Sequence, residues 1–398
     1  MNLAKNFLFL PLTVLGLLAA LPAQAADPLK IGILLPLTGT LASDGNRLLK
    51  ANQLAVTQIN AANLPGLPGG KVELVVADTQ SKPEIARSEA ERLISREKVS
   101  IVVGGYSSAS VLPATQVVER YRVPFIVTSA TADAITERGL QFVFHVAPKG
   151  SWSARDIANF IEYLNTKKGQ NIDKVALAYE DGPFGQSVSK AYKDLLPSRG
   201  LQIVAEESFR TGSPDLSTQA AKLKASGAKL VLIVCYVDDE SMLLRALAAQ
   251  QYRPYVLGYG GGHVHPTLLK LGDVAEGSFG VVEWMADMQK PASKAFAGAF
   301  TAAYGTAPLS NSAQAYAATW AAALAASEVK GADPVAIRDA LRKISIKDGP
   351  ASLLPNNALA FDKDGQNQIG TVMTQVIGNK FVTVWPEAFA ADQVKLAK

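Results

Sequence analysis

Small and hydroxyl-bearing residues follow two short apolar runs in the first half of the chain. They are Ser107, Ser108, Ser129, Ala130 and Thr131. Ser108 opens a segment with helical spacing, so backbone N–H groups and the positive end of a helix dipole would face a ligand beside it. Gly104 and Gly105 come just before it and let the backbone approach that ligand closely. With the hydroxyl groups, these features suit an anionic group, most simply a carboxylate. Taken singly, each residue also fits a helix cap or a turn.

Aromatic side chains follow apolar runs later in the chain, where they could line the same site. The set is Tyr179, Phe184, Tyr236, Tyr259 and Trp284. Aromatic walls would bury the apolar body of a ligand. Packing within the core is the alternative for each of these residues.

The runs that precede these residues alternate with amphipathic, helix-like stretches. Those expected to be buried strands are Leu29–Leu35, 72–77, 101–103, 125–127 and 143–146, then 175–179, 202–206, 230–235 and 255–257. Strands that alternate with helices of about 10–15 residues indicate parallel sheets covered on both faces. Because the alternation runs twice, we predict an α/β fold of two doubly wound lobes. Ligands bind at the carboxyl ends of such strands, which points to a cleft between the lobes.

The composition limits the classes of protein open to this chain. Of its 398 residues, 48% are hydrophobic and 19% are charged, which excludes intrinsic disorder. A formal net charge of +4 without a basic run gives no support for nucleic-acid binding. The single cysteine, Cys235, excludes an intramolecular disulfide framework and a Cys-rich metal site.

The N-terminal segment predicts export. Lys5 precedes an apolar stretch at 7–21, and the small residues Ala23 and Ala25 follow it. This order is typical of a secretory signal peptide over residues 1–25, cleaved after Ala25. The apolar stretch is shorter than the ~20 residues of a membrane span. We therefore expect a soluble mature protein in the periplasm.

Several longer motifs resemble one known family. They are IGILLPLTG at 31–39, Gly104-x-x-x-Ser108, VPFIV with TSAT at 123–131, VALAYEDGPFG at 175–185 and DVAEGSFG at 273–280. Over essentially the whole mature chain, the sequence resembles the periplasmic solute-binding proteins of ABC uptake systems, of the Leu/Ile/Val-binding type. The resemblance implies a type I periplasmic binding fold, with a three-segment hinge and closure around one small molecule. It implies one lobe at 26–147 and about 278–352, and a second at 148–277 and about 353–398.

The same resemblance implies roles for individual residues. Ser108 would receive the ligand carboxylate, and the segment from Ser129 through Ala130 to Thr131 would contact carboxylate and ammonium. Tyr236 would face the ligand from the second lobe. Three positions depart from the family: Phe184-Gly185 replaces a Tyr-Gly pair, Asp44 replaces a common aromatic residue, and Gly260 replaces an acidic residue that pairs with the ligand ammonium.

The missing acidic residue bears on the ligand. A buried ammonium without a counter-charge is costly. Unless Glu180, Asp181 or Asp44 substitutes, Gly260 favours a carboxylate without an ammonium, such as an aromatic or other hydrophobic acid. We expect His263 to meet the carboxylate or a hydroxyl at the far end of such a ligand. A branched-chain or other amino acid is the alternative.

No local motif predicts catalysis. The chain has no G-x-S-x-G elbow, Walker loop, G-x-G-x-x-G or H-E-x-x-H. His263 and His265 lack an adjacent third metal ligand, and the sequence DKDG at 362–365 predicts a hairpin turn rather than a calcium loop. We expect a monomeric binding protein with no enzyme activity, cofactor or metal, which delivers its ligand to an ABC transporter permease. The alternatives are a sensing protein that acts with a separate receptor and a periplasmic hydrolase.

Overall fold

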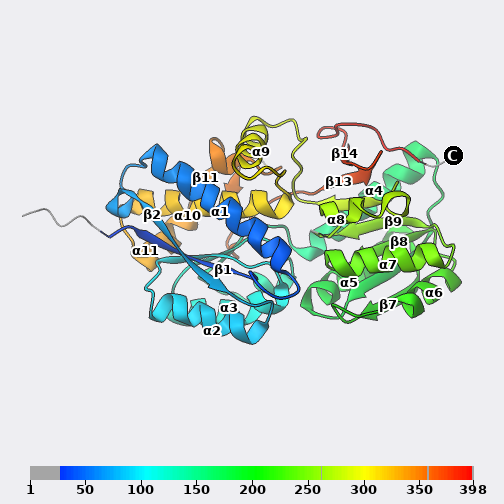
Figure 1. Cartoon of the computed structure of the whole chain (residues 1–398), viewed down its shortest axis with the longest axis horizontal. Helices are drawn as coiled ribbons and strands as arrows, with labels where there is room; N and C mark the ends of the chain where they lie inside the picture. Colours follow the sequence, from blue (N-terminus) through cyan, green and yellow to red (C-terminus); the bar gives the residue numbers. More distant parts are fainter. Residues whose placement is uncertain (1–26, 261, 356–357, 397–398) are drawn as a thin grey trace, which may run out of the picture.

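Two α/β lobes lie side by side along the long axis of the molecule (Figure 1). The structure is a computed structural model that describes residues 27–260, 262–355 and 358–396. The predicted signal peptide at 1–25 lies outside the described residues. The two-lobed α/β architecture confirms the fold class expected from the alternation of strands and helices.

Lobe 1 contains most of the first third of the chain and a later helical segment. Its strands are β1 (Leu29–Leu35), β2 (Val72–Asp78), β3 (Ile101–Gly104), β4 (Phe125–Val127) and β5 (Val143–His145), with a short pair of β11 (Ser345–Ile346) and β12 (Leu359–Ala360). Its helices are α1 (Ala42–Ala62), α2 (Pro83–Ser95), α3 (Ser108–Tyr121), α9 (Pro291–Tyr304), α10 (Ser310–Val329) and α11 (Pro334–Leu341).

The main sheet of lobe 1 is parallel, in the order β2-β1-β3-β4-β5. All residues of β3 and β4 are buried, as expected for strands with helices on both faces. Apolar residues of α2 and α3 form the core on one face, and those of α1, α9 and α10 form it on the other. The layering fixes where the carboxyl ends of β3 and β4 lie, and hence the residues that follow them.

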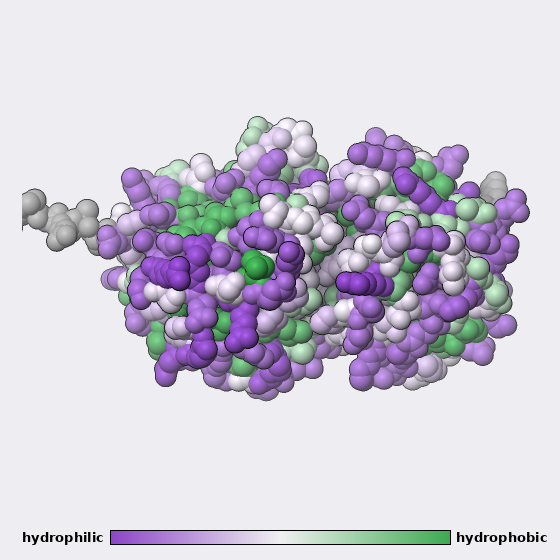
Figure 2. Space-filling view, turned by 60° about the horizontal axis from the view of Figure 1, so that its bottom comes forward, coloured by the Kyte–Doolittle hydropathy of each residue, from purple (hydrophilic) through white to green (hydrophobic). Residues whose placement is uncertain are grey.

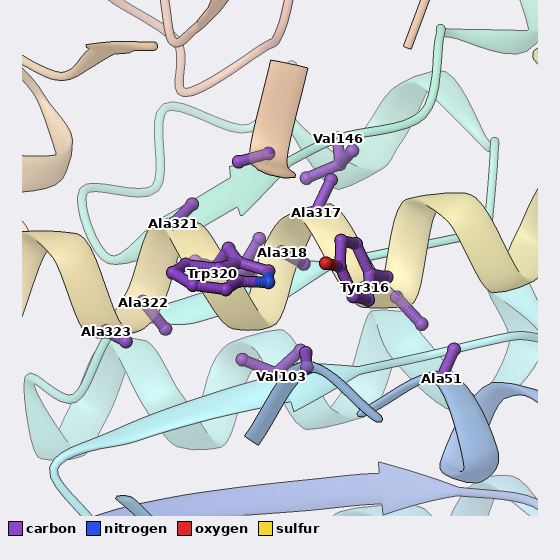
Figure 3. Packing of buried hydrophobic residues seen from close by; sticks show 14 of the residues in the cluster. Ala51, Val103, Val146, Tyr316, Ala317, Ala318, Trp320, Ala321, Ala322 and Ala323 are labelled. Carbon is purple, nitrogen blue, oxygen red and sulfur yellow. The ribbon is translucent and has the colours of Figure 1, made fainter. Parts of the chain in front are cut away.

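Helix α10 is the central element of the larger core in lobe 1. Its sequence is rich in alanine, and its residues are buried almost all round for most of its length, as in a helix enclosed by protein. Figure 3 shows Tyr316 and Trp320 on α10, with Val103 below the helix and Val146 above it. This packing places α10, and with it the residues of its first turn, against the rest of lobe 1.

Lobe 2 contains the middle of the chain and its C-terminal strands. Its helices are α4 (Gly150–Lys168), α5 (Pro183–Leu195), α6 (Ser217–Ala225), α7 (Val237–Ala249) and α8 (Pro266–Leu269). Its strands are β6 (Lys174–Glu180), β7 (Gln202–Phe209), β8 (Leu230–Val234), β9 (Tyr255–Tyr259), β10 (Phe279–Val282), β13 (Val372–Val376) and β14 (Phe381–Trp385). The order is β14-β13-β10-β9-β8-β6-β7, with β13 and β14 antiparallel.

The strand pairing corrects two of the expected lobe boundaries. Strand β10 pairs with β9 and β13, so the chain returns to lobe 1 after Val282 and not at about 278. Strand β12 pairs with β11 of lobe 1, so the last return to lobe 2 comes just before β13 and not at about 353. Backbone pairing with distant strands decides to which lobe a segment belongs, and local sequence does not show that pairing.

On the face of the molecule that Figure 2 shows, hydrophilic residues cover much of both lobes. Among the described residues, none of the helices combines the length and the apolar character needed to cross a membrane.

Candidate functional site

The carboxyl ends of β3 and β4 bring the predicted hydroxyl groups together. The chain leaves β3 through Gly104 and Gly105, with φ of 137° and 86°, values that L-residues with side chains rarely adopt. A Cβ on Gly104 would lie 2.5 Å from the carbonyl oxygen of Leu34. The turn therefore depends on glycine, and it delivers Ser108 to the first turn of α3.

Ser108 joins the two ligand-facing segments of lobe 1. Its side chain is buried, and its Oγ accepts a hydrogen bond of 3.2 Å from the backbone N–H of Ala132. Its own hydroxyl hydrogen is then available to a ligand. Ser107, the residue before α3, makes no capping bond with its side chain. The side chains of these two serines therefore do not cap α3, which was the alternative role.

The segment after β4 is held by backbone bonds that leave its side chains for the site. The N–H groups of Ser129 and Ala130 both donate to the carbonyl of Gly105. Thr131 is buried, and its Oγ1 lies near the Tyr259 hydroxyl without completing a hydrogen bond of good geometry among the described residues. A buried hydroxyl without a partner is costly unless a ligand or water completes it.

Lobe 2 faces these residues with aromatic rings. Phe184 lies in the first turn of α5, and Tyr236 directly precedes α7. Their ring centroids are 5.8 Å apart, and Tyr236 lies 5.9 Å from Tyr106 of lobe 1. Gly260 has φ of 101°, and a Cβ there would lie 3.2 Å from Cζ of Phe184. Glycine therefore lets the Phe184 ring fill the space where the family's acidic side chain was expected.

A cavity lies between the two lobes, and most of the predicted site residues line it. These are Ser108, Ser129, Ala130, Thr131, Phe184, Tyr236 and Gly260. Its volume is about 30 Å³, room for about two water molecules. This volume is far smaller than that of a pocket that holds an organic ligand.

Three predicted site residues lie outside this cavity. Ser107 contacts the hydroxyl of Tyr236 at 3.4 Å but faces a neighbouring space behind Tyr106. Asp44 is buried and accepts a hydrogen bond of 3.2 Å from Nδ2 of Asn311. Burial raises the pKa of Asp44 to about 6, although Tyr106 and Asn311 oppose the rise. Asp44 thus contacts Asn311 of the cavity wall and does not itself line the cavity.

His263 is the third, and the expected contact between it and the ligand is corrected by the structure. The ring is fully buried within lobe 2, with Nδ1 at 2.5 Å from Oε1 of Glu240 on α7. Three glycines provide the space: Cβ atoms on Gly258, Gly262 or Gly280 would come within 2.8 Å of the carboxylate or the ring. The glycine-rich sequence thus makes room for the buried pair of His263 and Glu240. Local spacing in the sequence does not reveal this pair.

The other candidates from the sequence have structural roles. Glu180 accepts bonds of 2.7 Å from the N–H groups of Gly182 and Gly185, at the start of α5. Tyr179 donates to Glu206, and Trp284 is fully buried against Phe296. Tyr259 is buried beside Phe184. Core packing is therefore the role of Trp284 and Tyr259.

Glu283 is the functional candidate that sequence reasoning missed. It directly follows β10 and lines the cavity with Ser108, Ser129 and Thr131. Its Oε2 accepts a hydrogen bond of 2.8 Å from the hydroxyl of Ser310. Burial raises the pKa of Glu283, and the Ser310 hydroxyl opposes that rise. An acidic side chain therefore lines this cavity, although Gly260 carries none.

The first turn and a half of α10 completes the wall of lobe 1. Ser310, Asn311 and Gln314 line the cavity beside Glu283. A signal for Glu283 was present in the sequence, since it is an acidic residue immediately after an apolar run. The expected boundary at about 278 assigns that run to lobe 1, whereas it forms β10 of lobe 2. For α10 there was no local signal, because Ser310, Asn311 and Ser312 are polar residues of the kinds that commonly open a helix.

Comparison with known proteins agrees with this architecture. A family model described as periplasmic binding protein matches residues 28–380. The Leu/Ile/Val-binding protein homolog 7 of Brucella suis biovar 1 (strain 1330) is 33% identical over 400 residues, which cover 97% of this chain and 98% of that protein. The Leu/Ile/Val-binding protein homolog 8 of Brucella melitensis biotype 1 is 32% identical over 387 residues and covers 94% of each chain.

Solved structures share the fold. The branched-chain amino acid transporter substrate-binding protein LivJ of Streptococcus pneumoniae, in complex with isoleucine, has a TM-score of 0.80 at 25% identity, covering 90% of this chain and 100% of that one. An ABC transporter solute-binding protein from R. palustris, in complex with benzoate, has a TM-score of 0.80 at 20% identity, covering 92% and 99%. Because the family model spans most of the chain and the relatives match over nearly their whole length, this chain belongs to the periplasmic binding proteins, in the branched-chain amino acid group of ABC transporter binding proteins.

Proposed function

We propose that this protein captures an α-amino acid between its lobes and delivers it, chemically unchanged, to the permease of an ABC uptake system. The observation that carries the proposal is the carboxylate of Glu283 in the same cavity as Ser108 and Thr131. An α-amino acid presents an anion and a cation on one carbon atom. A cavity with donors on one part of its wall and a carboxylate on another matches that pair of charges.

The carboxylate of the ligand binds to lobe 1 at the start of α3. Ser108 offers its hydroxyl hydrogen, and Ser129 and Thr131 add two further hydroxyl groups. The helix dipole of α3 favours negative charge at this end. Lobe 2 then closes by bending at the hinge, and Phe184 and Tyr236 cover the ligand.

The ammonium of the ligand binds to Glu283. The Glu283 carboxylate is buried, and this burial disfavours its charged form. A ligand ammonium beside it reverses this effect, because each charge then compensates the other. Glu283 thereby takes the role that Gly260 cannot perform.

A hydrophobic carboxylic acid without an ammonium, favoured by the sequence, is the second candidate ligand. Two observations support it. Gly260 carries no acidic side chain, and the ring of Tyr236 lies within 6 Å of the rings of both Tyr106 and Phe184 along the wall. With this ligand, Glu283 would bind in its protonated form, as a hydrogen-bond donor.

The cellular setting belongs to the same proposal. The signal peptide at 1–25 exports the protein to the periplasm, where it acts as a monomer without cofactor, metal or catalysis. The membership in a family of solute-binding proteins supports this setting. A sensing role with a separate receptor would use the same closure of the lobes and would differ only in the partner that binds the closed form.

Calorimetry on ligand-stripped protein tests the choice of ligand. We expect an α-amino acid to bind, and its analogue without the amino group to bind at least tenfold more weakly. Glu283→Gln should abolish most of that discrimination, whereas Glu328→Gln, at an exposed position near the end of α10, should preserve it. Equal affinity for the amino acid and its deaminated analogue in the unmodified protein would favour the hydrophobic acid.

A further inference from the structure

Two side chains at the start of α10 make the cavity wall of lobe 1 polar beyond what an amino acid backbone requires. Asn311 and Gln314 both line the cavity, and they lie three residues apart, on one face of the helix. Their exposed fractions are 4% and 1%. Oδ1 of Asn311 and Nε2 of Gln314 are buried and have no hydrogen-bond partner among the described residues.

The chemical role of each amide is fixed by its neighbour. Nδ2 of Asn311 donates to Oδ1 of Asp44 at 3.2 Å, so the other end of this amide is an acceptor. Gln314 acts as a donor toward the carboxylate of Glu283 and thereby lowers its pKa, without completing a hydrogen bond of good geometry. The amide nitrogen of Gln314 carries two hydrogens, so it can face Glu283 with one and offer the other to a ligand. The cavity wall therefore presents an unmatched acceptor on Asn311 and a donor on Gln314 that Glu283 occupies only in part.

We propose that the ligand is an amino acid whose side chain ends in a carboxamide, with its N–H on Oδ1 of Asn311 and its C=O on Nε2 of Gln314. The inference rests on the proposed function, since it assumes that the α-carboxylate and α-ammonium bind at Ser108 and Glu283. It assigns a side-chain subsite to α10.

Other side-chain classes match this wall less well. A carboxylate only accepts hydrogen bonds and would face the carboxylate of Glu283, and an ammonium or guanidinium only donates. An aliphatic side chain leaves both amides unmatched inside a closed cavity, which costs the hydrogen bonds that water makes in the open form. A site built around polar groups discriminates strongly against an isostere that lacks them. The carboxamide is the group that donates and accepts from one rigid plane.

Isosteric pairs of amino acids test this directly. Calorimetry on ligand-stripped protein should show asparagine or glutamine binding about tenfold or more tightly than its isostere, leucine or methionine. Gln314→Met keeps the length of the side chain and removes the donor, and should reduce that ratio to about twofold or less. Gln53→Met, at an exposed position of α1, is the matched control and should leave the ratio unchanged.

The outcomes separate this proposal from the one beneath it. If amino acids bind but leucine or methionine binds as tightly as its amide isostere, the carboxamide subsite is wrong and the proposed function stands. If no amino acid binds, both are wrong. The ratio in the unmodified protein decides the matter even if Gln314→Met does not fold.

Discussion

His263 Nδ1 and Glu240 Oε1 lie 2.5 Å apart in the interior of lobe 2, and both side chains are fully buried. The pair connects two parts of the ligand-facing wall. Glu240 stands in the first turn of α7, directly behind Tyr236, whose carbonyl accepts the N–H of Glu240. His263 follows the loop that begins with Gly260. The positions of Tyr236 and of the loop at Gly260 therefore both depend on the contact between His263 and Glu240, which lies outside the cavity.

Gly258→Ala should destabilise the protein strongly. Its Cβ would lie 2.3 Å from Oε1 of Glu240 and 2.5 Å from Nδ1 of His263, so the pair must separate or the strand must shift. We expect a loss of about 1–3 kcal/mol in the free energy of unfolding, measured by urea denaturation. Gly298→Ala is the matched control: it lies within α9 with open space around it, and should gain about 0.5–1 kcal/mol. Equal effects at both positions would contradict the packing argument.

A double-mutant cycle should show that Glu240 and His263 act as a pair. Removing one partner leaves a polar group buried and unmatched, so Glu240→Ala alone should cost about 3–5 kcal/mol. The Glu240→Ala, His263→Ala double variant should cost at least 1 kcal/mol less than the sum of the single variants. The measurement is equilibrium unfolding of all four proteins, and additive losses would mean that the contact contributes no coupling.

Asp44→Asn should stabilise the protein increasingly as the pH rises. Burial raises the pKa of Asp44 to about 6 from an ordinary value of 3.8, so the folded protein holds this proton more tightly than the unfolded chain. The contribution of Asp44 to the free energy of unfolding is therefore complete below pH 3.8 and is lost as the pH rises through about 6. The neutral amide has no such loss.

The unfolding free energy of the Asp44→Asn variant, relative to the unmodified protein, should therefore rise between pH 4 and pH 7.5 by on the order of 2 kcal/mol. Other titrating groups, including His145 with its pKa lowered by burial to about 4, cancel in the difference. A difference that stays constant over this pH range would show that Asp44 titrates normally.

Ser108→Ala should weaken ligand binding by about 1–3 kcal/mol, because it removes a hydroxyl donor from the carboxylate. Ser107→Ala is the neighbouring control: this hydroxyl lies outside the ligand cavity, so the affinity should change by less than about 0.5 kcal/mol. Calorimetry with the same ligand compares the two variants, after circular dichroism has shown that both are folded. A larger effect at Ser107 would place the carboxylate elsewhere.

The fold was predictable because its signals are local. Apolar runs separated by helical stretches, such as Leu29–Leu35 before α1, need no long-range information to be recognised. The hydroxyls of Ser108, Ser129 and Thr131 were also within reach, since residues that follow neighbouring parallel strands meet at one edge of the sheet.

What could not be predicted depends on contacts between distant segments. Glu240 and His263 are 23 positions apart. Nothing in the glycine-rich sequence shows that the space beside its glycines is filled by the His263 ring and the Glu240 carboxylate. Asn311 and Asp44 are separated by 267 positions. Glu283 was missed because β10 joins lobe 2 through pairing with β9 and β13, which a turn-like sequence does not reveal.

Identifying the molecule that co-purifies with the protein tests the central claim most directly. Mass spectrometry of the supernatant from denatured protein, with Ser108→Ala and Glu283→Gln purified in parallel, should identify an α-amino acid in the unmodified protein and much less of it in either variant. A ligand that carries no carboxylate, or one retained equally by all three proteins, would contradict the account.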